Sequence, residues 1–212
     1  MKLSLKLLAS YALIVAVAIT GMGIILYRSA HERLQSGAEQ MLSQAAQAAR
    51  SALEERFGRV ERSLSYLATD TYVQRIINEQ NYLSEYQKAY DVNNYLEPTI
   101  ISVMEQNALI EGLDFYTYGE VKETRIFLRD IEKYRDDPRL DCGEQPVWRF
   151  DGEEITASRV LANIWQPNHS AVLVCELEKD EAFAKLLPEM ELDCTLRLTD
   201  AEGRVIFEQK DV

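Results

Sequence analysis

Hydrophobic residues form an unbroken run near the start of the chain. Leu7–Tyr27 (LLASYALIVAVAITGMGIILY) carries no charged side chain. As a helix rising about 1.5 Å per residue, this run covers the roughly 30 Å hydrocarbon core of a bilayer. The pattern predicts one transmembrane helix in the cell membrane. Residues 1–6 then form a cytoplasmic tail, and the bulk of the chain, which is acidic, lies outside the cytoplasm.

A cleavable signal peptide is the competing interpretation of this run. Ala16-Val17-Ala18 offers the small residues of a cleavage site after a short apolar stretch. Further uncharged residues follow Ala18, however, and Arg28 spoils the small-residue pattern that ends at Ala30. We therefore favour an uncleaved anchor, in a chain that is either anchored once or is the front piece of a longer protein.

A second hydrophobic pattern follows the first and repeats at helical spacing. Between residues 28 and 67 the chain has no proline, and apolar residues recur every three or four positions with one slip. These positions are Leu34, Ala38, Met41, Ala45, Ala48 and Ala52, then Leu53, Phe57, Val60, Leu64 and Leu67. The spacing predicts one long amphipathic, membrane-proximal helix. Its apolar stripe packs on the chain's own domain or on a second copy in a dimer, and both can hold at different heights.

Shorter helices are predicted over residues 68–107. Asp70 is a favourable N-cap for a helix containing Val73, Ile76 and Ile77 and ending near Asn81. Ser84 and Glu85 open another helix, which Pro98 kinks or restarts before the apolar residues continue. The chain up to this point is therefore expected to be almost wholly helical.

From residue 108 onward the pattern changes to strands. Stretches rich in branched and aromatic residues predict strands over 109–118, 147–150, 155–165 and 171–177, and a hairpin over 195–207. A short helix is expected over 180–187, residues 123–134 are ambiguous, and 135–146 is a charged loop. Helices gathered before a run of strands indicate an α+β fold with an antiparallel sheet.

Composition narrows the function classes. The chain has 212 residues, with 23 Lys and Arg against 35 Asp and Glu and a net charge of −12. Such an acidic chain is a poor nucleic-acid binder, because phosphate contacts need concentrated basic residues. The acidic pairs Asp136-Asp137 and Glu153-Glu154 are expected to be solvated loop charges. We find no acid/base pair, nucleophile or phosphate loop, so no catalytic residue is assigned.

Histidine and cysteine are sparse. His31 follows the apolar run and His169 lies in a polar turn, which predicts surface positions for both. Cys142, Cys175 and Cys194 lack metal-ligand spacing, and Cys175 alternates with Leu173 and Leu177, as a buried residue would. No metal site, cofactor or disulfide is predicted.

Several stretches resemble a known family. AVLVCELEKDEAFAKLL (Ala171–Leu187) and TLRLTDAEGRVIFEQ (Thr195–Gln209) resemble a strand, a short helix and a hairpin of the extracytoplasmic Cache (PAS-like) sensor regions of bacterial receptors. Asp200 and Gly203 stand at the hairpin positions, and Val147-Trp148-Arg149 resembles a Trp-bearing strand of such domains. The likeness is greatest to two-component sensor histidine kinases of Gram-positive bacteria, with residues 68–212 as the sensor domain.

This resemblance implies binding without catalysis. In such domains a small-molecule ligand lies between the sheet and the helix-loop layer that precedes it. The implied lining residues are Tyr116, Tyr118, Trp148, Arg159 and Trp165, with Asp200 a weaker candidate. The resemblance leaves the ligand open and implies a homodimer through the membrane-proximal helix. A chemoreceptor, a diguanylate cyclase, a membrane-bound transcription regulator and an anchored structural protein without a ligand are the alternatives.

Overall fold

A computed structural model describes most of the chain. It covers residues 2–77, 84–118, 127–151, 154–162, 170–184, 186, 195–199 and 203–210, with the backbone alone for 2–14 and 85. The chain divides into two units, residues 1–48 and 49–212.

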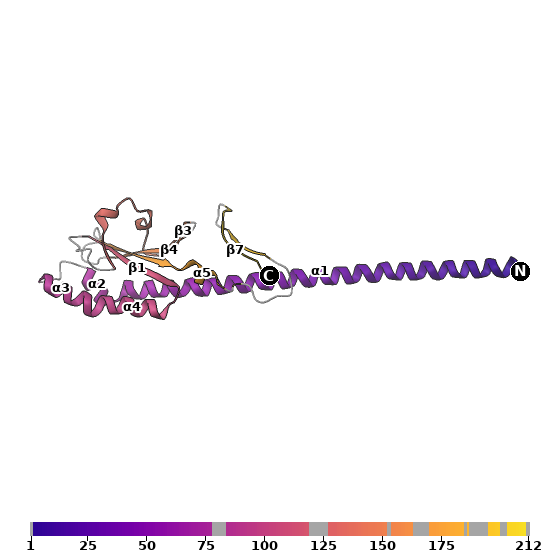
Figure 1. Ribbon diagram of the computed structural model, residues 1–212, viewed down its shortest axis with the longest axis horizontal. Coiled ribbons are helices and arrows are strands. Elements are labelled where there is room, and N and C mark those ends of the chain that lie inside the picture. Colours follow the sequence, from indigo (N-terminus) through magenta and orange to yellow (C-terminus); the bar gives the residue numbers. More distant parts are fainter. Residues whose placement is uncertain are drawn as a thin grey trace. The chain divides into compact units, whose positions relative to one another are not determined.

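The first unit belongs to the long helix α1, which spans Lys2–Thr69 (Figure 1). This helix includes both hydrophobic patterns found at the start of the sequence. Among the helices of the described part of the chain, none combines the length and the apolar character needed to cross a membrane. The membrane span expected over Leu7–Tyr27 therefore stays a prediction.

The second unit begins with the last turns of α1 and a group of shorter helices. These are α2 (Thr71–Ile77), α3 (Glu85–Asp91), the π-helix η2 (Val92–Leu96) and α4 (Glu97–Gln106). Asp70 caps α2 by accepting hydrogen bonds from the amides of Tyr72 and Val73, and Ser84 caps α3. The predicted cap at Asp70 and the predicted helix start at Ser84 are confirmed, whereas the expected end of the first short helix near Asn81 lies outside the described residues.

A five-stranded sheet follows the helices. Its strands are β1 (Ile110–Thr117), β2 (Leu128–Asp130), β3 (Val147–Asp151), β4 (Glu154–Leu161) and β5 (Ala171–Leu177). Their order in the sheet is β2-β1-β5-β4-β3. The central strand is therefore β5, the last of the five along the chain. The α+β class is thus confirmed.

The expectation of a wholly antiparallel sheet is wrong at one pair. β2 runs parallel to β1, with Phe115 opposite Leu128 and Thr117 opposite Asp130, while the other pairs are antiparallel. A parallel pair cannot be joined by a tight hairpin, so β2 is not the hairpin partner of β1.

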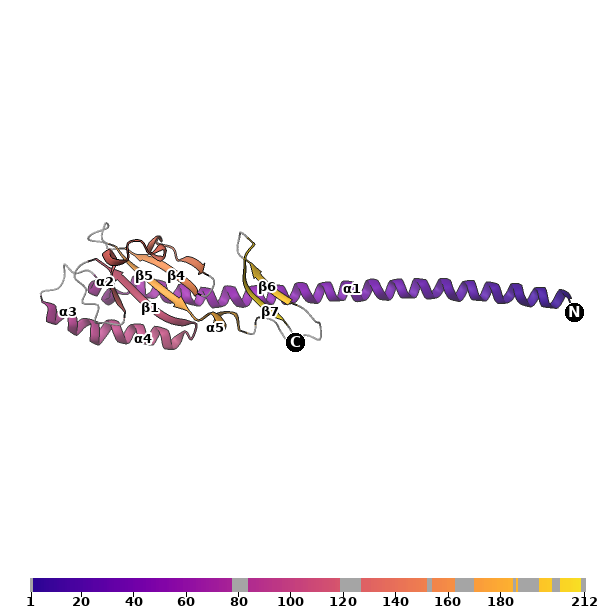
Figure 2. The same ribbon diagram turned by 45° about the horizontal axis from the view of Figure 1, so that its top comes forward.

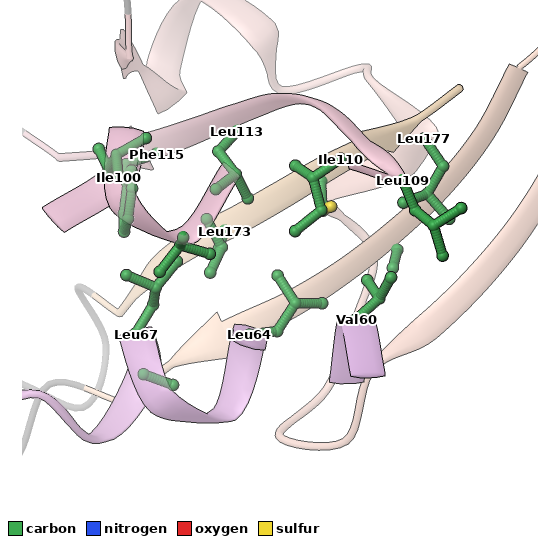
Figure 3. Packing of buried hydrophobic residues seen from close by; sticks show 14 of the residues in the cluster. Val60, Leu64, Leu67, Ile100, Leu109, Ile110, Leu113, Phe115, Leu173 and Leu177 are labelled. Atoms are coloured by element: carbon green, nitrogen blue, oxygen red, sulfur yellow. The ribbon is translucent and has the colours of Figure 1, made fainter. Parts of the chain in front are cut away.

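One face of the sheet, the inner face, packs against the last turns of α1. Figure 2 shows these turns behind the sheet, with α4 running alongside them. Figure 3 shows Val60, Leu64 and Leu67 of α1 pointing toward the sheet, and all three are completely buried. The sheet contributes Leu113, Phe115, Leu173, Cys175 and Leu177. The second part of the predicted apolar stripe therefore packs on the chain's own domain.

A short helix and a hairpin complete the second unit. They are α5 (Lys179–Phe183) and the antiparallel pair β6 (Thr195–Thr199) and β7 (Val205–Lys210). The predicted hairpin is confirmed, and Gly203 has a φ of 82°, a conformation that favours glycine. An isolated hairpin is marginal in water, and here Phe207 stacks on buried Phe183 with ring centres 4.7 Å apart.

Candidate functional site

The outer face of the sheet, opposite α1, carries a mixture of apolar and charged side chains. Side chains alternate along a strand, so Asp114 and Tyr116 of β1 share this face with Val172, Val174 and Glu176 of β5. Tyr116, Val172 and Val174 form a small buried cluster with Ile131. The segment between β2 and β3 covers the cluster with two 3₁₀ turns, η3 (Ile131–Tyr134) and η4 (Pro138–Leu140).

Arg139, in η4, is the centre of this outer-face site. Its guanidinium donates to both carboxylate oxygens of Asp137 at 2.8–3.1 Å and to Glu176 at 2.6 Å. The guanidinium also donates to the Tyr116 hydroxyl at 3.4 Å. Asp137 in turn caps η4 by accepting the backbone amide of Arg139 at 2.8 Å. One arginine therefore ties the covering segment to two neighbouring strands of the sheet.

Burial and charge shift the ionisation of this group in different directions. Burial disfavours the charged form of Asp137, but the hydrogen bonds and positive charge of Arg139 outweigh it and hold the Asp137 pKa below its usual value. The hydrogen bond with Asp137 raises the pKa of Arg139. Burial raises the pKa of the Tyr116 phenol, which stays a neutral hydrogen-bonding group at physiological pH.

Asp114 lies beside this group but differs from Asp137. Arg129 is its ion-pair partner at 3.3 Å. Burial is nevertheless the larger influence and raises the pKa of the Asp114 carboxyl. Two carboxylates on one face thus respond oppositely to their surroundings.

A buried hydroxyl on the same face has no partner. Ser158 of β4 lies opposite Val174 of β5, and its side chain is completely buried. Its Oγ makes no hydrogen bond within the described part of the protein. A buried hydroxyl without a partner costs free energy.

Two of the residues predicted to line the ligand site lie on the inner face instead. Trp148 donates through Nε1 to Glu61 of α1 at 2.9 Å and packs edge-on against Phe57. Arg159 donates to the Ser65 hydroxyl of α1 at 2.6 Å. These side chains attach the sheet to α1.

The structure therefore does not bring the predicted set together. Tyr116 and Tyr118 belong to the outer-face cluster, and Trp148 and Arg159 contact α1. Trp165 and Asp200 lie outside the described residues.

The centre of the outer-face site was not predicted from the sequence. The expectation of solvated loop charge is wrong for Asp137, because its side chain is only 13% exposed and binds Arg139. Asp136 is exposed, as expected. The local signal was Asp137-Pro138-Arg139, an acidic cap followed by a turn-forming proline and a basic residue that can reach back.

The thiols and acidic groups of the described residues do not suggest catalysis. Burial raises the pKa of Cys142 to about 11 and that of Cys175 further, so both stay protonated and weakly nucleophilic. Cys175 is completely buried, as predicted, and Cys194 lies outside the described residues. No three His, Cys, Asp or Glu side chains of the described part gather as metal ligands.

Comparison with known protein families, with curated proteins and with solved structures finds no match to this chain.

Proposed function

We propose that this chain is the ligand-sensing input region of a membrane-anchored receptor with a Cache-like, PAS-related domain. The observation that carries the proposal is the make-up of α1. The same helix holds an uncharged apolar segment near its start and supplies core residues of the α+β domain near its end. A change in how the sheet packs on α1 would therefore act directly on the helix that is proposed to enter the membrane.

Anchoring rests on the run Leu7–Tyr27, of which the structure describes side chains from Val15 onward. Val17, Ile19 and Met22 are each about two-thirds exposed, and Ile24 to Tyr27 are exposed on successive positions around the helix. A helix that is apolar on all sides belongs in a protein core or a bilayer. The neighbouring positions Leu34 and Met41 are also exposed, which supports a homodimer through the membrane-proximal helix.

The sensing step is proposed at the outer face. In PAS-like domains the last strand of the sheet is central, and β5 has that place here. A ligand that enters beneath the covering segment would exchange contacts with Arg139, Tyr116 and Ser158. It would shift a two-state equilibrium by its differential affinity for the two packings. A histidine kinase is the proposed output, and a chemoreceptor or cyclase would use the same input.

Membrane topology is tested with fusions after residue 212. Alkaline phosphatase is active only outside the cytoplasm, so a fusion to it is expected to be active. A fusion to green fluorescent protein is expected to be dark, because this protein does not become fluorescent when it is exported through the general secretory route. The variant Val17→Arg/Ile19→Arg places two charges in the apolar run and is expected to release the protein from membranes. Arg28→Gln/Arg33→Gln serves as the control that keeps the run intact. A bright fluorescent fusion with an inactive phosphatase would contradict the proposed orientation.

Sensing is tested by a thermal-shift screen of the full chain in detergent micelles against sugars, amino acids and organic acids. A ligand that raises the melting temperature is expected to lose affinity in Tyr116→Phe, which removes the hydroxyl that Arg139 contacts. Tyr86→Phe, at an exposed position of α3, is the matched control. A ligand insensitive to Tyr116→Phe but lost in Arg159→Gln would contradict the outer-face site.

A further inference from the structure

We propose that a groove between α1 and α4 is a separate binding site for small ring-bearing carboxylates. The groove has a volume of about 530 Å³, which lies within the range of small-molecule pockets. It is lined by Arg62, Ser63 and Tyr66 of α1 and by residues of η2 and α4. These side chains are distinct from the outer-face site, so the inference does not rest on the proposed function.

The groove exists because small side chains meet where the two helices run side by side. Ser63 of α1 faces Thr99 and Ser102, which lie one turn apart on the same side of α4. Large residues at these positions would fill the space between the helices. The hydroxyls instead give the groove a partly polar lining, and Ser102 accepts a hydrogen bond from Gln106.

Arg62 gives the groove a positive charge. Its side chain is exposed, and the described part of the chain offers it no ion-pair partner, whereas Arg50, Arg75 and Arg139 each pair with a carboxylate. In a protein with a net charge of −12, such an arginine is a local attraction for anions. A guanidinium matches a carboxylate with two parallel hydrogen bonds, which favours this anion in particular.

Two tyrosines supply flat surfaces beside that charge. Tyr66 is 54% exposed and Tyr95 is 41% exposed. One face of Tyr95 is covered by Tyr72, with ring centres 5.2 Å apart and planes within 8°. The groove therefore meets the rest of the ring, where a ligand ring can stack or pack against the edge.

This aromatic surface is held in place by a buried charge. The guanidinium of Arg75 lies 5.3 Å from the centre of the Tyr72 ring and pairs with Asp91 at 3.1 Å. The Asp91 residue is only 3% exposed and also accepts a hydrogen bond from Gln87. The stack that ends at Tyr95 is thus preorganised, which lowers the entropic cost of binding a ring.

The π-helix η2 sets the position of Tyr95. Its wider turn accommodates an extra residue, and such turns are frequent at functional sites. Val92 and Leu96 are buried in the core, while Asn94 and Tyr95 between them line the groove. The same π-helix therefore supplies residues of both the core and the groove.

The test is calorimetric titration of the full chain in detergent micelles with benzoate. Benzamide, which has the ring without the charge, and cyclohexanecarboxylate, which has the charge without the aromatic face, are the comparison ligands. Benzoate is expected to bind, and benzamide to bind about tenfold more weakly, because a hydrogen bond to a charged group is lost. Cyclohexanecarboxylate is expected to bind more weakly than benzoate, by a smaller factor.

Matched variants assign the binding to the groove. Arg62→Gln is expected to lower the affinity for benzoate about tenfold. Arg59→Gln, at an exposed position of α1 outside the groove, is expected to leave that affinity unchanged. Tyr66→Leu is expected to lower the affinity for benzoate, and Tyr86→Leu, at an exposed position of α3, is its control. Absence of benzoate binding, or equal affinity in Arg62→Gln and Arg59→Gln, would overturn the proposal. Disulfide formation between two copies of Ser102→Cys would also overturn it, because a second copy would then occupy the groove.

Discussion

The two faces of the sheet are built from different chemistry although they share the same strands. The inner face packs branched and aromatic side chains on α1, with Trp148 and Arg159 as its polar contacts to the helix. On the outer face, Arg139 joins Asp137, Glu176 and Tyr116 under a short covering segment. Buried apolar area dominates the inner face, whereas the outer face combines a small buried apolar cluster with paired charges. The inner face is thus suited to holding the fold, and the outer face to responding to conditions.

The largest expected effect is on the inner face. Leu64→Ala removes a completely buried side chain and leaves a cavity beside the sheet, so the free energy of unfolding should fall by about 2–5 kcal/mol. Urea denaturation followed by circular dichroism measures this loss.

The control uses the same residue type on the same helix. Leu42, outside the predicted stripe, is 45% exposed, and Leu42→Ala should leave the stability of the domain within about 0.5 kcal/mol. Equal losses for the two variants would show that burial on the inner face does not set the size of the effect.

A smaller loss is expected at the outer face. Arg139→Gln deprives Asp137 and Glu176 of their shared partner and should cost about 1–3 kcal/mol. The lower end is expected, because the Glu176 side chain is 40% exposed and water can replace the arginine there. The same denaturation experiment on Arg135→Gln is the control, since Arg135 pairs with Glu132 at the surface. A loss at Arg139 as large as that of Leu64→Ala would remove the distinction between the faces.

The pH dependence should separate two carboxylates of the outer face. The pKa of Asp137 is lowered in the folded state, so its stabilising contribution is present at neutral pH and is lost as the pH falls below the usual Asp value of about 3.9. The pKa of Asp114 is raised by burial, so its ionised form opposes folding at neutral pH and protonation relieves this. Asp137→Asn should therefore destabilise and Asp114→Asn should stabilise at neutral pH.

For both variants, the difference in stability from the wild type should become smaller as the pH falls. Denaturation midpoints between about pH 3 and pH 7 measure this for the two variants. Differences of the same sign for Asp114→Asn and Asp137→Asn would contradict the opposite influences of burial and of Arg139.

The smallest effect is expected where the same chemistry is fully exposed. Arg197 of β6 pairs with Glu208 of β7 at 2.7 Å, and the hydrogen bond from Arg197 lowers the pKa of Glu208. Exposed ion pairs contribute little, so Arg197→Gln should not measurably change the melting temperature, at low or high salt. A clear loss that salt abolishes would show that the hairpin depends on this pair.

Local rules predicted much of the fold. Asp70 and Ser84 cap helices because their side chains bond amides two or three residues ahead, an effect contained in the nearby sequence. The strands over 110–117 and 171–177 follow from branched and aromatic residues. The parallel pairing of β1 and β2 could not be predicted in this way, because local patterns do not set the direction in which a three-residue strand pairs.

The candidate site was less accessible to sequence reasoning, for two physical reasons. Arg139 owes its role to Glu176 on a strand that comes much later in the chain, and composition marks its own segment only as a charged loop. The orientation of Arg159, in contrast, was available from alternation. It shares the inner side of β4 with Ile155, Ala157 and Leu161, whose apolar character marks that side as the core.

Cys175 and Cys142 allow the opening of each face of the sheet to be followed separately. Cys175 is completely buried on the inner face of β5, and half-buried Cys142 packs on the outer-face cluster. A thiol with a raised pKa reacts with a disulfide reagent only after it becomes exposed and loses its proton. In a chain carrying Cys194→Ser, the labelling rates of the two thiols would therefore report how often each face opens. A ligand that protects Cys142 without slowing Cys175 would act on the covering segment alone, and one that slows both would act through the whole sheet.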